Sequence, residues 1–108
     1  MSFIATAWNN SHRHQSGAGY GLKISFEDRE RFFNREWRSV YLQLNGFEQT
    51  IEVNVGKASF WNRNCGELIK KDIGRWFIQN GHANWPQGRP PRVIINLVGE
   101  RLFRIELE

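Results

Sequence analysis

Two histidines near the start of the chain have a spacing that suggests metal chemistry. His12 and His14 are separated by one residue, so an extended backbone would place both imidazoles on the same side. A metal site needs at least a third ligand, and no candidate has a diagnostic spacing. The candidates are His82, Asp28 and Glu30. We therefore expect exposed loop histidines, with no metal and no cofactor.

A glycine run follows at Gly17-Ala18-Gly19-Tyr20-Gly21. A dinucleotide-binding loop has the pattern GxGxxG, follows a strand and opens a helix, whereas these glycines precede a strand. No GK[ST] follows, so a P-loop is excluded as well. We expect the glycines to adopt backbone conformations that other residues cannot adopt, or to leave room for a neighbouring backbone.

An alternative function is a hydrolase or nuclease-type enzyme that uses His12 or His14 as a base and His82 as an acid. No spacing between these residues demands that chemistry. Cys65 falls on an apolar stripe, where cysteine behaves as a small hydrophobic residue rather than a nucleophile. We expect a protein that is not an enzyme, with no catalytic residues.

Length and composition indicate a single globular domain over residues 1–108. Hydrophobic residues make up 40% and charged residues 24%, which is ordinary for folded proteins. The single cysteine excludes an intrachain disulfide. The N-terminal segment lacks the pattern of a signal peptide, and no apolar run approaches the roughly 18 residues of a membrane helix. We expect a cytoplasmic protein without a membrane partner.

The net charge of +4 comes from one part of the chain. The segment from residue 59 to residue 92 contains six basic residues and only two acidic ones, Glu67 and Asp72. This predicts a positive patch for an anionic partner, although a solvated helix face with i,i+4 ion pairs would also explain it. The six basic residues are Arg63, Lys70, Lys71, Arg75, Arg89 and Arg92.

The first third of the chain predicts an arm, a strand and a short helix. Residues 1–18 suggest an irregular N-terminal arm, with a short strand possible at its start. Tyr20 to Ser25 alternates as a half-buried strand does. Ser25 and Asp28 fit a capping box that opens a helix over about residues 26–36.

The middle of the chain predicts a hairpin. Apolar residues alternate on both sides of Asn45-Gly46, the preferred pair for a two-residue type I′ turn. Such a turn would pair Leu44 with Phe47 and Val40 with Ile51.

A long helix over about residues 59–80 is expected next, with Ser59 as its N-cap and Gly81 as its stop. Its apolar stripe repeats every four residues, and Gly66 and Gly74 would each cost about 1 kcal/mol within it. The stripe is Trp61, Cys65, Ile69, Ile73 and Phe77. We expect an irregular loop over residues 85–91, which contain three prolines. We expect a second hairpin from the strands Val93–Val98 and Leu102–Leu107.

The order strand, helix, hairpin, long helix, hairpin predicts an α+β fold. We expect an antiparallel sheet of about five strands, covered on one face by the long helix. Edge strands of such a sheet favour pairing between copies, so a homo-oligomer is expected, most simply a dimer.

The leading functional prediction is a small non-enzymatic binding domain for nucleic acid or another polyanion. The six basic residues would contact phosphates, and Trp85 would stack or anchor. Trp61 falls on the apolar stripe, Trp76 flanks it, and Trp37 falls on the inward side of the helix expected over residues 26–36. This leaves Trp8 and Trp85 as the tryptophans expected at the surface. A protein-interaction or self-assembly module is the further alternative, because an exposed Trp-Pro loop also suits a protein interface.

Three stretches, SGAGYGLKIS, SFWNRNCGELIKKDIGRWF and GHANWPQGRPPR, occur in an order that resembles a family of small uncharacterised bacterial proteins of about 100 residues. The resemblance implies a standalone bacterial domain. It implies no activity, ligand or catalytic residue.

Overall fold

A computed structural model describes residues 1–10 and 14–108. The expectation for His12 therefore lies outside the described residues. Ten elements follow one another along the chain: β1 (Ser2–Asn9), β2 (Tyr20–Ser25), α1 (Phe26–Phe32), β3 (Ser39–Leu44), β4 (Thr50–Asn54), α2 (Ala58–Trp61), β5 (Cys65–Ile69), α3 (Lys71–Gln79), β6 (Arg92–Gly99) and β7 (Leu102–Leu107).

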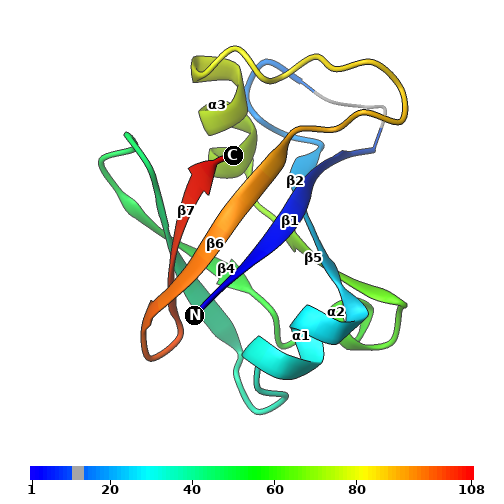
Figure 1. The fold of residues 1–108 in the computed structure, drawn as a ribbon, viewed down its shortest axis with the longest axis vertical. Helices are drawn as coiled ribbons and strands as arrows, with labels where there is room; N and C mark the ends of the chain where they lie inside the picture. The colour runs from blue at the N-terminus through cyan, green and yellow to red at the C-terminus, as the bar shows by residue number, and fades with distance from the viewer. Residues whose placement is uncertain (11–13) are drawn as a thin grey trace.

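The strands form one mixed sheet of seven strands in the order β4-β3-β7-β6-β1-β2-β5. Neighbouring strands are antiparallel except β3 and β7, which run parallel. The sheet curls until its two edge strands, β4 and β5, approach each other, so the molecule is nearly barrel-shaped (Figure 1). The predicted five-stranded antiparallel sheet under a long helix is therefore wrong. When a sheet curls into a barrel, the inner faces of its strands cover one another. Helices are then needed only at the two ends of the barrel.

Three short helices lie at the two ends of this barrel. Helix α3 lies at one end, and α1 and α2 lie together at the other (Figure 1). None of the helices in the described ranges is long and apolar enough to span a membrane. The core between these ends consists of inward-facing aliphatic side chains and of aromatic rings, including the stacked pair Phe33 and Phe103.

The predicted long helix is instead three elements, α2, β5 and α3. A repeat of four residues misled the prediction because residues four apart also share one face of a strand. In β5, Gly66 and Leu68 are buried, while Cys65 and Ile69 are more exposed. A Cβ at Gly66 would lie 2.8 Å from the Phe60 ring, so this glycine admits an aromatic side chain of α2 into the core.

The predicted irregular arm contains a strand in the middle of the sheet. Strand β1 pairs with β2 on one side and with β6 on the other. Phe3, Ala5 and Ala7 are buried, so the alternation typical of a strand is present. Two of these three inward residues are alanines, which are only weakly hydrophobic, so the sequence does not predict a strand of this length.

Other predictions are confirmed at the level of the element. Strand β2 has the predicted bounds, and Ser25 caps α1 by accepting the Asp28 backbone N–H at 3.2 Å. The β3–β4 hairpin pairs Val40 with Val53, not with Ile51, because the loop is longer than two residues. A shift of two residues keeps the same side chains facing inward. The β6–β7 hairpin turns at residues 100–101.

Buried Arg29 organises the end formed by α1 and α2. Its side chain is 1% exposed, and Nη1 donates to the backbone oxygens of Phe60 and Arg63 at 2.9 and 2.8 Å. Nε donates to Glu30 at 3.1 Å. Burial alone would raise the pKa of the Glu30 carboxyl, but hydrogen bonds and charges from Arg29 and Arg35 lower that pKa overall. The guanidinium group thus fixes the backbone that leads from α2 into β5.

We predict that Arg29→Met lowers the free energy of unfolding by about 3 kcal/mol, because two carbonyl groups lose their donor. Urea denaturation measures this. Arg31→Met is the matched control on the same helix, and its exposed side chain should change stability by no more than about 0.5 kcal/mol. Equal effects of the two substitutions would contradict the assigned role of Arg29.

The glycine run before β2 is explained by contact with α3. Gly17 has φ +95° and lies against the helix backbone, where a Cβ would be 2.7 Å from the Arg75 nitrogen. A Cβ at Gly74 would in turn lie 2.6 Å from the Gly17 Cα. Two backbones therefore meet with no side chain between them, as the glycines allow. The expectation that these glycines leave room for a neighbouring backbone is confirmed.

We predict that Gly74→Ala destabilises the protein by about 2 kcal/mol, because the new methyl group overlaps the Gly17 backbone. Helix propensity alone predicts the opposite sign, a gain of about 1 kcal/mol. Thermal and urea unfolding decide between them. Gln79→Ala in the same helix is the control and should be nearly neutral. A more stable Gly74→Ala protein would contradict this prediction, because it would mean that the Gly17 backbone moves aside at little cost.

Candidate functional site

The seven residues predicted to bind an anion lie in three places. Arg63 follows α2, where its backbone oxygen accepts from Arg29 of α1, and its side chain pairs with Glu67 at 3.4 Å. Lys70, Lys71 and Arg75 lie just before and within α3. Trp85, Arg89 and Arg92 line one hollow. The residues therefore do not share one helix face, and only Trp85, Arg89 and Arg92 line the same hollow.

The hollow has a volume of about 410 Å³ and lies between the segment after α3 and the adjoining ends of β6 and β7. Its lining contains two arginines, an indole and an imidazole, together with the carboxylate of Glu108. The described lining residues are His82, Asn84, Trp85, Arg89, Pro90, Pro91, Arg92, Leu107 and Glu108. Cationic, aromatic and hydrogen-bonding groups are the ones that nucleic-acid sites combine.

Three features hold the segment that forms this hollow. Helix α3 ends at Gln79, Gly81 follows its C-cap with φ +72°, and the His82 backbone N–H donates to the Phe77 oxygen at 2.8 Å. The Tyr20 hydroxyl donates to the Ala83 oxygen at 3.1 Å. The Trp85 ring packs against Tyr20 and Phe77 with centroid distances of 6.2 and 6.4 Å. Trp85 is therefore an anchor for the segment, with only part of its surface open.

The cations near α3 and the hollow differ in their pairing. Arg75 pairs with Asp72 at 3.3 Å, and Arg92 pairs with Glu108 at 3.3 Å. Within residues 1–10 and 14–108, no ion pair engages the exposed side chains of Lys70, Lys71 or Arg89. An unpaired cation can bind a phosphate without first breaking an ion pair, so Arg89 is better placed to bind one than Arg92, which is paired with Glu108.

The histidines of the hydrolase alternative are not all gathered at the hollow. His82 lines it. His14 does not, and its Nδ1 accepts the Ser16 backbone N–H at 3.1 Å, within its own turn. In the described ranges, no three His, Cys, Asp or Glu side chains lie close enough to share a metal ion. Cys65 lies at the start of β5 with an intermediate exposure.

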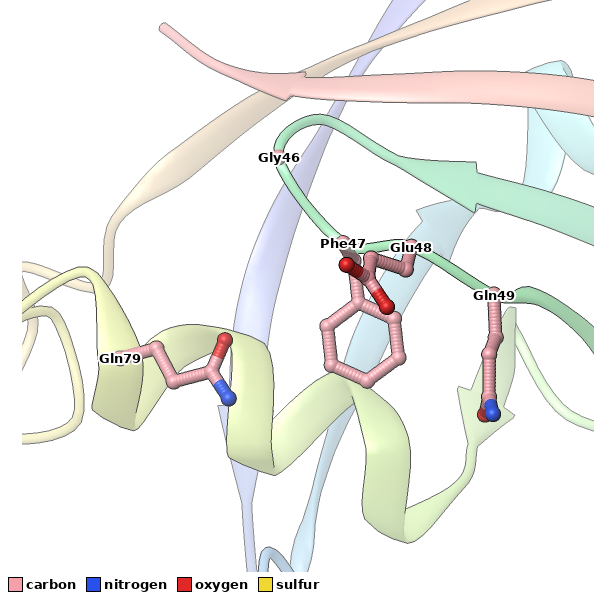
Figure 2. A pocket seen from close by; sticks show the side chains of 5 residues that line it. All are labelled: Gly46, Phe47, Glu48, Gln49 and Gln79. Atoms are coloured by element: carbon pink, nitrogen blue, oxygen red, sulfur yellow. The ribbon is translucent and has the colours of Figure 1, made fainter.

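A second hollow, of about 260 Å³, lies between the β3–β4 loop and α3 (Figure 2). Its described lining is Gly46, Phe47, Glu48, Gln49 and Gln79, which includes a carboxylate and no cation. It therefore does not suit an anionic ligand. The loop is fastened to the helix because Trp76 Nε1 donates to the Asn45 oxygen at 2.8 Å.

Trp8 is a surface residue whose position the sequence pattern did not define. Its neighbours in β1, Ala5 and Ala7, are buried, and Trp8 lies on the opposite, outer face of the sheet with partial exposure. Trp8 is opposite Gly21 in β2, and a Cβ at Gly21 would lie 3.3 Å from the Trp8 ring. The period-two pattern of β1 would have placed Trp8 outward, had that strand been recognised.

Comparison of the chain with protein-family models, with curated proteins and with solved structures finds no match. The resemblance to a family of small bacterial proteins therefore stays a prediction. The function is argued from the site alone.

Proposed function

We propose that this protein is a non-enzymatic binding domain for an anionic partner, and that the partner is nucleic acid. The observation that carries the proposal is the hollow beside α3, where unpaired Arg89 lies with Arg92 and an anchored indole, Trp85. Phosphate groups supply most of the binding energy for nucleic acids, and arginine binds them with two parallel hydrogen bonds.

The location of the cations supports the same proposal. Lys70, Lys71 and Arg75 lie before and within α3, and the segment that forms the hollow directly follows this helix. A polyanion longer than one phosphate could contact the hollow and then follow α3 toward these cations, although Lys70 itself lines another hollow, with Glu52 and Arg38. Arg63 does not line the hollow, because its backbone is held by Arg29 of α1 and its side chain pairs with Glu67.

Self-assembly stays a separate prediction. The sheet has two edge strands, β4 and β5, and these edges approach each other in the nearly closed barrel. Light scattering on the protein used for binding would count the subunits. A homo-oligomer is compatible with nucleic-acid binding and is not required for it.

We predict that wild-type protein binds short oligonucleotides in low salt, with an affinity that falls steeply as salt rises. Arg89→Ala/Arg92→Ala should bind more weakly, with a salt slope reduced by about one to two, because two phosphate contacts are lost. Tryptophan fluorescence follows the titration.

The matched control is Arg63→Ala, which removes an exposed arginine that does not line the hollow. It should leave both the affinity and the salt slope unchanged. Equal losses in the two variants would indicate a general charge effect and would contradict the site. Absence of any binding by the wild-type protein in low salt would contradict nucleic acid as the partner.

A further inference from the structure

The outer face of β6, β1 and β2 carries an aromatic side chain that the core does not use. On each of these strands, every second side chain points away from the core. Strand pairing aligns these outward side chains in rows that run across neighbouring strands. In one row Trp8 is opposite Gly21, which is opposite Ile69. Because Gly21 has no side chain, the side chains of Trp8 and Ile69 cover it from the two neighbouring strands. Trp8 Cε3 and Ile69 Cγ1 each lie 3.3 Å from the position that a Cβ of residue 21 would take.

The next row of the same face contains two cations, Arg92 and Lys23, and it ends at Glu67 of β5, which is opposite Lys23 and pairs with Arg63. Thr6 is opposite Arg92 in β6 and opposite Lys23 in β2. Both cations are exposed, and they lie on the two sides of β1. Trp8 follows Thr6 on this face, so an indole lies next to a row that contains two positive charges. This arrangement crosses three adjacent strands (Figure 1).

The same row continues into the hollow beside α3. Arg92 is both the β6 member of this row and a lining residue of the hollow. Pro91, also in the lining, accepts the Ala7 backbone N–H at 2.8 Å, directly beside Trp8. The outer face and the hollow therefore form one continuous surface.

The other tryptophans have internal roles. Trp37, Trp61 and Trp85 pack against the core, and Trp76 is buried. Trp61 also lies against two arginines, with the Arg35 guanidinium 4.5 Å from its ring centre. Trp37, Trp61 and Trp85 are partly exposed as well, but they pack against the core, whereas Trp8 covers a glycine on the outer face of the sheet, next to Arg92 and Lys23.

We propose that Trp8 stacks on a base of single-stranded nucleic acid, while Lys23 and Arg92 hold the phosphates on either side. This rests on the proposed function and adds the form of the partner. Single-strand binders combine positive charges that follow the backbone with aromatic rings that stack on bases. A duplex keeps its bases stacked on one another, so it offers no base to Trp8.

The test compares three oligonucleotides of equal length: a single strand, a duplex, and a single strand whose sugars carry no bases. Wild-type protein is expected to bind the ordinary single strand about tenfold more tightly than the other two. Trp8→Leu should lose this preference, because leucine still covers Gly21 but has no aromatic face. Trp8→Phe should keep part of it.

Lys23→Gln provides a second variant at an exposed position that should not disturb folding. It should weaken single-strand binding and lower the salt slope by about one. Arg104→Gln is its control, because Arg104 is an exposed cation of β7 away from Trp8. Circular dichroism confirms that each variant is folded.

The outcomes separate this inference from the proposed function. Equal affinity of the wild-type protein for all three oligonucleotides would overturn the Trp8 platform while the anionic site stands. Unchanged single-strand preference in folded Trp8→Leu would do the same. No binding to any of them in low salt would overturn both proposals.

Discussion

A contact between two backbones determines how one end of this barrel is built. Gly17, in the β1–β2 connection, lies against the first turns of α3 at Gly74, with no side chain between them. Such an approach is open only to glycine, and any larger residue would push the helix away from the sheet. The position of α3 follows from it, and that position determines where the segment after the helix can run.

Helix α3 then joins three connections that are distant in sequence. The β1–β2 loop meets it at Gly74, the β3–β4 loop is bound through Trp76, and the segment after Gly81 folds back so that Trp85 packs against Phe77. Each of these is held by a different kind of interaction. The hollow with Arg89 and Arg92 is a product of this arrangement, since it forms where that segment returns to β6.

The sequence allowed the local elements to be predicted better than their assembly. Strand β2, the Ser25 cap and the β6–β7 hairpin depend on neighbouring residues and were recognised from alternation and capping patterns. The closure of the sheet depends on the parallel pairing of β3 with β7, which no local pattern announces. Residues 65–69 were mistaken for helix because a four-residue repeat suits both a helix and one face of a strand.

The candidate site was predicted in part for the same reason. Charge counting selected a segment that contains Arg89 and Arg92, which line the hollow, and also Arg63, which lies apart from it because its backbone oxygen accepts from Arg29. Trp8 was expected at the surface, but its position opposite Gly21 required the register of β1 with β2. Functional surfaces assembled from several strands need that register, which composition does not contain.

The central claim is that one continuous surface, from the hollow to the outer face of β6, β1 and β2, binds nucleic acid. Backbone and indole NMR spectra recorded while a short single strand is added would test it most directly. The account predicts shifts at Trp8, Lys23, Arg89 and Arg92, with little change in α1, α2 and Arg63. Shifts confined to the α1–α2 end, or none in low salt, would contradict it.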